Sequence, residues 1–149
     1  MKFFPIFVFF VLIVLSLFFV NLERQNNKNP TVIIENKTFL LDVARSAQEQ
    51  EVGLAKYNKL PQNMAMLFPF KTSGYYSFWM KNMKFPIDII YIKDDKIVDI
   101  FANVPNPKSE NEKLKIYVSK SKANYVLEIN ANLSKQYGFK TGSGVKINF

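Results

Sequence analysis

The sequence predicts an α+β domain of mostly antiparallel strands, a compact sheet or barrel-like body behind an N-terminal transmembrane helix. Three observations lead to this class. From residue 31 onward, short segments of alternating apolar and polar residues are separated by turn residues. Only two stretches carry signals for the start or end of a helix. Residues 3–20 form one long apolar run. Since 48% of the 149 residues are hydrophobic, the chain can bury a real core.

The apolar run at residues 3–20 is interrupted only by Ser16. A helix of this length would span about 27 Å at ~1.5 Å per residue, close to the ~30 Å hydrocarbon core of a bilayer. The run is longer than the apolar core of a signal peptide, and no small-residue cleavage site follows it. We therefore expect an uncleaved anchor within residues 1–22 and a polar tether at 23–30. The domain itself should cover 31–149 and lie outside the cytoplasm.

The first half of the domain should open with a hairpin and continue into a helix. The two strands and the helix are expected at 31–35, 38–45 and 47–57. Ser46, followed by Glu49 three residues later, forms a capping box that predicts the start of the helix. Gly53 inside this helix indicates either a close neighbour or simple tolerance of a weak helix former.

The second half of the domain is predicted from turn residues and alternation. Strands are expected at 64–70, 75–82, 86–92, 96–104, 115–119, 124–130 and 144–149. Asp94 and Asp95 should form the turn of a second hairpin, because no calcium-loop spacing surrounds them. A polar loop is expected at 105–113, and Gly138 should end a short helix at 131–137.

Composition restricts the chemistry that the domain could perform. The chain contains no histidine and no cysteine, which removes the commonest general base, thiol nucleophiles, disulfides and the usual zinc ligands. We expect no metal and no cofactor. Beyond residue 30 the chain has 17 basic and 11 acidic residues, a net charge of +6 without a basic block. This distribution is typical of a lysine-rich solvated surface, so no nucleic-acid partner is expected.

The segment 78–82, Phe-Trp-Met-Lys-Asn, carries the only tryptophan and sets polar groups beside a dense aromatic run. Trp79, Lys81, Asn82 and Asp88 are the candidate ligand-binding residues, bordering a cleft for a small polar or anionic ligand. The indole would stack on the ligand, the amide would donate and accept hydrogen bonds, and the ammonium would favour an anion. The alternative is that Trp79 fills the core and Asn82 serves the following turn.

Three ionisable residues stand in segments that otherwise alternate as buried strands. Asp88 shares a strand face with Ile90, and Glu128 shares one with Val126. Arg45 is the only arginine beyond residue 24, in a domain with sixteen lysines. Because a charge near a core needs a partner, Arg45, Asp88 and Glu128 are candidates for a structural ion pair. Asp88 and Glu128 could instead act as a catalytic acid and base.

With these residues in view, the domain resembles the domain of unknown function (DUF) 192 family from about residue 31 to the C-terminus. The resemblance rests on the segments at 43–45, 53–54, 66–70, 78–82, 86–89, 117–119 and 125–128, with Gly138 and Gly142. It implies a compact, mostly β domain with a short helix, often behind an export signal or anchor, and no established reaction. The chain departs from the pattern at Met83, where Thr is usual, and at Asn132, where Gly is usual.

Three classes of function fit these features. The first is a membrane-anchored module that binds a small polar ligand or an envelope partner. The second is a hydrolase or lyase that uses Asp88 and Glu128. The third is a structural subunit of an envelope assembly. Single-stranded nucleic acid conflicts with the expected location, although an exposed Trp79 beside a basic groove would favour it. The residues alone assign no reaction and no oligomeric state.

Overall fold

The computed structural model describes residues 11–16, 29–109 and 111–149 of the chain. Residues 11–16 are helical. Within the described residues, no helix has the length and apolar character needed to cross a membrane. Most of the predicted anchor at 3–20 and most of the tether at 23–30 lie outside the described residues. Pro30–Asn148 form one compact unit, and the following description concerns this unit.

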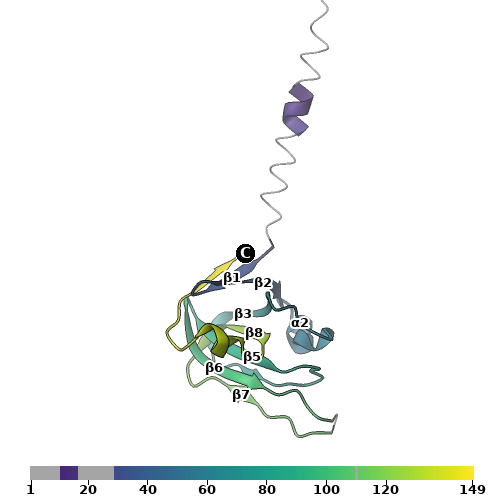
Figure 1. Cartoon of the computed structure of the whole chain (residues 1–149), viewed down its shortest axis with the longest axis vertical. Helices are drawn as coiled ribbons and strands as arrows, with labels where there is room; N and C mark the ends of the chain where they lie inside the picture. The colour runs from purple at the N-terminus through teal and green to yellow at the C-terminus, as the bar shows by residue number, and fades with distance from the viewer. Residues whose placement is uncertain (1–10, 17–28, 110) are drawn as a thin grey trace, which may run out of the picture. The chain divides into compact units, whose positions relative to one another are not determined.

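The unit is a mostly antiparallel α+β fold built on one curled sheet of seven strands (Figure 1). The strands are β1 (Thr31–Ile34), β2 (Lys37–Val43), β3 (Met64–Gly74), β5 (Ile87–Lys93), β6 (Lys96–Val104), β8 (Ala123–Asn130) and β9 (Val145–Asn148). Their order across the sheet is β6-β5-β8-β3-β2-β1-β9. Only β2 and β3 are parallel, because the chain between them crosses over through the helical residues 47–56.

The curl brings the two ends of the sheet together at one point. Lys96 at the start of β6 forms a bridge with Gly144, just before β9. Backbone N–H groups of Ile97 and Gly142 donate across this junction, to Ser143 O at 3.0 Å and Ile97 O at 2.8 Å. The sheet is therefore a half-barrel whose edge strands are partly satisfied by one another.

Two apolar cores lie on the two faces of the strands. The barrel core collects side chains from all seven strands and from the segment after β8, including Leu67, Ile90 and Leu127. The outer core lies on the other face of β3, β5 and β8 and includes Phe68, Ile89 and Val126. Successive residues of a strand therefore enter different cores. These central strands are apolar on both faces, so their sequence reads as almost continuously hydrophobic.

The outer core is covered by helical turns and by a second, small sheet. These elements are α2 (Ala47–Val52), the 3₁₀ turn η1 (Gly53–Lys56), β4 (Ser77–Phe78) and β7 (Tyr117–Val118). The predicted capping box is confirmed: Glu49 N–H donates to Ser46 Oγ at 3.2 Å, and Ser46 N–H donates to Glu49 Oε2 at 2.8 Å. The predicted helix at 47–57 is shorter than expected, because α2 ends where Gly53 takes a φ of 52° and a ψ of −144°.

The sequence left two interpretations of Gly53 open, a close neighbour or simple tolerance, and in the structure Gly53 lies beside Phe68. A Cβ atom placed on Gly53 would lie 3.5 Å from the Cζ atom of the Phe68 ring. The backbone conformation at Gly53 is one that side-chain-bearing residues rarely adopt. Glycine therefore lets the chain turn from α2 into η1 directly above the outer core.

Two predicted strands are much shorter in the structure. The segment expected as a strand at 75–82 is extended and paired only at Ser77–Phe78, and the one at 115–119 only at Tyr117–Val118. The segment at 75–82 cannot continue as a strand because Lys81 and Asn82 form a turn, closed by a hydrogen bond from Met83 N–H to Met80 O at 3.2 Å. Asn82 takes a φ of 59°, a left-handed conformation that asparagine tolerates.

The short second helix, α3 (Leu133–Tyr137), packs its Leu133 into the barrel core. Gly138 ends it with a left-handed φ of 73°, as the sequence predicts. Asn132, where the DUF192 pattern usually has glycine, precedes the helix with a φ of 68°. Asparagine is one of the few residues with a side chain that adopts this conformation readily, so the departure from glycine keeps the turn.

Candidate ligand-binding pocket

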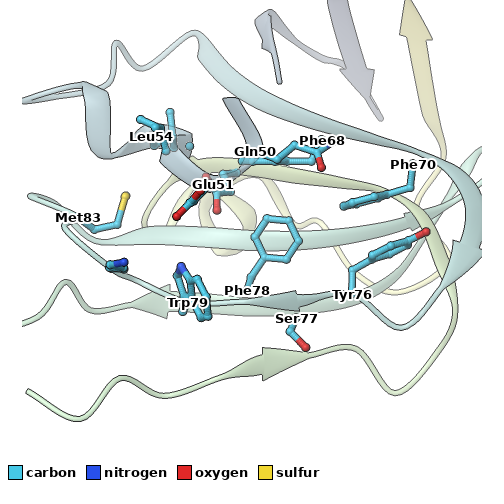
Figure 2. A pocket seen from close by; sticks show the side chains of 14 residues that line it. Gln50, Glu51, Leu54, Phe68, Phe70, Tyr76, Ser77, Phe78, Trp79 and Met83 are labelled. Carbon is cyan, nitrogen blue, oxygen red and sulfur yellow. The ribbon is translucent and has the colours of Figure 1, made fainter. Parts of the chain in front are cut away.

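A pocket of about 160 Å³ opens in the outer core, between the α2–η1 segment and the segment that contains β4 (Figure 2). Its floor is made of buried residues: Gly53, Leu54, Phe68, Met83 and Glu128. The remaining lining residues are partly buried or exposed: Gln50, Glu51, Val52, Phe70, Tyr76, Ser77, Phe78, Trp79 and Lys81. The pocket is therefore closed at its base and open to solvent at its rim.

Aromatic rings form most of one side of the pocket. The rings of Phe70 and Tyr76 stack with centroids 3.5 Å apart and an interplanar angle of 10°. The rings of Phe68 and Phe78 meet edge to face at 4.9 Å. Figure 2 shows Phe78 beside Trp79, with Phe70 and Tyr76 lying flat against each other. These contacts hold the rings in place without a ligand, so the wall is preorganised.

A buried hydroxyl fastens the β4 segment to the main sheet. The Tyr91 hydroxyl lies 2.8 Å from Tyr117 O and 3.1 Å from Tyr76 O. Burial, reinforced by the nearby carboxyl groups of Asp99 and Glu128, raises the pKa of this tyrosine well above its usual value. The hydroxyl therefore remains a donor at all ordinary pH values and ties β4 and β7 to β5.

On the opposite side, α2 is held by the amide of Gln50. Its Nε2 atom donates to Ala44 O at 3.2 Å and to Pro69 O at 3.3 Å, which links the helix to the end of β2 and the middle of β3. Figure 2 shows Gln50 and Glu51 across the pocket from Trp79 and Phe78. The two walls thus belong to elements that are anchored separately to the same sheet.

Glu128 is the one carboxyl group on the floor of the pocket among the residues that the structure describes. It lies on β8, opposite Met66 of β3 and Ile89 of β5, and only 5% of its surface is exposed. Among the residues that the structure describes, its carboxyl group has no hydrogen-bond or ion-pair partner. Burial raises the pKa of Glu128 from its ordinary value of 4.5 to about 8. Near pH 7 the group is therefore mainly a neutral carboxylic acid.

Asp88 has a different environment, because it lies on the opposite face of the sheet from Glu128. The register pairs Asp88 with Ile129, whereas Glu128 pairs with Ile89, so the two carboxyl groups point into different cores. This geometry rules out the predicted acid–base pair of Asp88 and Glu128, since the sheet separates them. Asp88 also lies away from the pocket and does not join Trp79 and Lys81 there.

The Asp88 carboxylate is fully buried and receives hydrogen bonds from three residues in two segments of the chain. Its Oδ1 atom accepts from Asn103 N–H at 2.7 Å and from Asn132 N–H at 2.9 Å. Its Oδ2 atom accepts from Ser134 N–H at 2.8 Å and from the Ser134 hydroxyl. Asp88 therefore joins the end of β6 and the start of α3 to β5, and neutral donors satisfy it in place of a guanidinium.

Arg45 does not occupy the buried strand face that the sequence suggested. Strand β2 ends at Val43, and Arg45 is exposed in the connection to α2, where its backbone N–H donates to Glu49 Oε2 at 2.8 Å. The structure therefore does not bring Arg45, Asp88 and Glu128 together. The strand-face argument placed Arg45 wrongly because it assumed two more residues of strand than form.

Of the other predicted ligand-binding residues, Trp79 and Lys81 line the pocket and Asn82 does not. Trp79 is 47% exposed at the rim, so it does not fill the core. Asn82 occupies the left-handed turn position and borders two neighbouring surface grooves. The prediction that Asn82 serves a turn describes its position in the structure.

Sequence reasoning missed the contribution of α2 and of β3 to the pocket. Gln50, Glu51 and Leu54 come from the helical segment, and Phe68 and Phe70 come from β3. Gly53 was the available signal, because a close neighbour was one of the two interpretations of a glycine in this helix pattern, and Gly53 lies beside Phe68. Nothing in the local sequence indicated that this neighbour would be the edge of a cavity.

Comparisons with known proteins agree with the family resemblance. The model of the DUF192 family, described as "Uncharacterized ACR", matches residues 31–147. A search of curated proteins finds no match. A crystal structure of a protein of unknown function from Novosphingobium aromaticivorans is 28% identical, with a TM-score of 0.68 over 78% of this chain and 83% of that one. A Sinorhizobium meliloti protein named as a candidate transcription regulator is also 28% identical, with a TM-score of 0.67 over 79% of this chain and 91% of that one.

Proposed function

Since the chain belongs to the DUF192 family, whose description assigns no reaction, we propose a function from the pocket itself: the domain binds a small organic molecule between α2 and β4. The observation that carries this proposal is the enclosed Glu128 carboxyl group at the base of an aromatic pocket. A buried polar group without a partner is costly, so such groups are usually kept where a ligand completes them.

Binding is favoured over catalysis by what stands around Glu128. Among the described residues, no second carboxyl group shares the floor, and Asp88 belongs to the other face of the sheet. Glu51 is exposed at the rim, and Lys81 is exposed beside Trp79. A hydrolase of the kind considered from the sequence needs two carboxyl groups facing one substrate. The pocket instead offers one enclosed polar group and a preorganised aromatic wall, the usual composition of a recognition site.

Trp79 is the only tryptophan of the chain, so its fluorescence reports directly on the rim of the pocket. With 47% exposure, we expect emission typical of a partly solvated indole and efficient quenching by acrylamide in the ligand-free protein. A panel of benzene-sized amines, alcohols, carboxylates and sugars should contain molecules that shift the emission and protect it from quenching. Strongly blue-shifted, unquenchable emission in the free protein would place the indole in the core and remove it from the site.

Truncation of the indole gives the matching affinity test, measured by calorimetry. Trp79→Ala should weaken binding of any ligand found in this way by roughly tenfold, since an aromatic contact contributes about 0.5–1.5 kcal/mol beyond its buried area. Tyr75→Ala is the control, because Tyr75 is exposed in the same segment but does not line the pocket. Equal affinities of wild type and Trp79→Ala, or no binding by any panel member, would argue against this pocket as the site.

We further propose that the domain works at the outer surface of a membrane, anchored by residues 3–20. The support is the apolar run of the sequence and the absence of a cleavage site after it. Protease added to intact cells should then degrade the domain and leave a membrane-bound fragment. Protection of the domain until the cells are lysed would place it on the cytoplasmic side, and a shortened protein in the medium would show that the anchor is cleaved.

A second candidate function is the binding of single-stranded nucleic acid. The exposed Trp79 stands near a groove lined by Lys81, Lys84 and Lys108, which is the combination that stacking and phosphate contacts require. This function would show as binding of oligothymidine that weakens steeply with salt and is lost in a Lys84→Glu, Lys108→Glu variant. Binding of small molecules without any response to oligothymidine would select the first proposal.

A further inference from the structure

The Glu128 carboxyl group presents unused acceptor positions to the pocket. An ionised carboxylate accepts several hydrogen bonds, yet none reaches Glu128 from the described part of the chain. Only 5% of the Glu128 surface is exposed, and Glu128 lines the pocket. A ligand that donates hydrogen bonds would therefore complete this group.

The charges around the pocket favour a cationic donor. The titratable groups on the elements packed against Glu128 are Glu51 from α2, Tyr76 before β4, Lys81 after β4 and Tyr91 from β5. Among the described lining residues, Lys81 is the single cation, and it is exposed at the rim. It forms no ion pair with Glu128. The carboxyl groups of Glu51 and Glu128 and the electron-rich faces of several aromatic rings favour a cation more strongly than Lys81 opposes one.

The size of the pocket limits the rest of the ligand. A cavity of about 150 Å³ holds a molecule of benzene size, and this pocket has about 160 Å³. The wall of Phe68, Phe70 and Phe78 offers no hydrogen-bonding groups to the body of such a ligand. The body should therefore be compact and apolar.

We propose that the ligand is a protonated primary amine with a compact apolar body, whose ammonium group donates to Glu128 while the aromatic wall holds its hydrocarbon. This inference rests on the pocket proposed above as a binding site and specifies its ligand class. It replaces the anionic ligand expected from Lys81, because Glu128 and not Lys81 is enclosed. Binding involves no covalent step, and the ligand remains a protonated amine in the complex.

Binding of this class couples to a proton. The free pocket holds Glu128 mainly as the neutral acid near pH 7, because burial raises the pKa of the group to about 8. An ammonium beside it favours the carboxylate, so one proton leaves Glu128 for solvent as the ligand binds. Affinity should therefore rise about tenfold per pH unit below pH 8 and level off above it. A neutral ligand that accepts a hydrogen bond from the acid would show the opposite trend.

Three matched probes test the inference on the full chain in nonionic detergent: cyclohexylmethylammonium, cyclohexylmethanol and cyclohexanecarboxylate. They share one ring and differ in charge. We expect the ammonium to bind at least tenfold more tightly than the alcohol at pH 8, the carboxylate to bind most weakly, and only the ammonium affinity to rise between pH 6 and pH 8. Equal or tighter binding of the alcohol or the carboxylate, a flat or inverted pH dependence, or no binding of the ammonium would overturn the inference.

Two variants assign the effect to Glu128. Glu128→Gln should abolish the preference for the ammonium and the pH dependence, because the amide keeps the shape but cannot ionise. Glu35→Gln is the matched control, an exposed glutamate between β1 and β2 that does not line the pocket, and it should keep both. If the ammonium fails while other members of the broader panel still bind and depend on Trp79, the amine class is wrong and the pocket proposal stands; if nothing binds, both fail.

Discussion

Glu128→Gln is expected to stabilise the ligand-free protein at pH 9 by several kcal/mol relative to wild type, and to change its stability little at pH 4. Burial raises the pKa of Glu128 from 4.5 to about 8 in the folded protein, whereas the unfolded chain keeps the ordinary value. The favourable contribution of the neutral acid is therefore fully present below pH 4.5 and is lost as the pH rises through 8. A shift of this size corresponds to roughly 4–5 kcal/mol when the loss is complete.

The measurement is guanidinium unfolding of the full chain at several pH values between 4 and 9, followed by circular dichroism. The difference in unfolding free energy between wild type and Glu128→Gln isolates this one group, because every other titrating residue is common to both proteins. Glu51→Gln, which alters an exposed glutamate on the rim, should follow the wild type at every pH. A wild type and Glu128→Gln pair whose stability difference stays constant across this range would show that Glu128 is not enclosed as described.

Asp88→Ala is the second large effect, a loss of roughly 3–5 kcal/mol of folding stability. The substitution leaves the backbone N–H groups of Asn103, Asn132 and Ser134 and the Ser134 hydroxyl without their acceptor. Each buried donor left unsatisfied costs about 1–3 kcal/mol, and relaxation of the α3 turn recovers part of the sum. Asp88→Asn should be nearly as damaging, because its NH₂ group would face donors rather than acceptors.

Asp95→Ala is the matched control for this prediction. Asp95 is an exposed aspartate in the turn between β5 and β6, and its replacement should change stability by less than about 0.5 kcal/mol. Hydrogen exchange adds a local measurement: the amides of Asn132 and Ser134 should lose protection in Asp88→Asn before the central strands do. If Asp88→Ala unfolds at the same guanidinium concentration as the wild type, the carboxylate does not hold α3 to the sheet.

Several local features could be predicted because neighbouring residues decide them. The capping box of Ser46 and Glu49 and the left-handed end of α3 at Gly138 depend on groups within a few residues of each other. Strand alternation also succeeded for the two central carboxyl groups. It placed Asp88 on the face of Ile90 and Glu128 on the face of Val126. Ile90 belongs to the barrel core and Val126 to the outer core.

Alternation within each strand did not show whether Asp88 and Glu128 share a face of the sheet. Whether Asp88 and Glu128 meet depends on which residues pair across β5 and β8, and the observed register puts Ile89 opposite Glu128 and Ile129 opposite Asp88. Registry between strands with 29 residues between them along the chain is a tertiary property. The acid–base and ion-pair hypotheses required a shared face, and the register decided against it.

The length of a strand was equally hard to foresee at Arg45 and at the segment 75–82. The residues of both segments have the composition of a strand, but a strand continues only where a neighbour pairs with it. Beyond Val43 the chain leaves the sheet for α2, and beyond Phe78 it turns at Asn82. Trp79 is therefore exposed at a rim, although its aromatic neighbours suggested either burial or a platform.

By itself the sequence determined the α+β class, the family, the local helix ends and the alternating faces of the central strands, since these depend on short-range chemistry and on composition. Only the tertiary structure decided that α2 packs across from β4, that Gly53 lies against the Phe68 ring, and that Glu128 has a cavity beside it and no partner among the described residues. A cavity is a volume that several distant segments fail to fill. Its existence follows from how they pack together and not from the residues of any one of them.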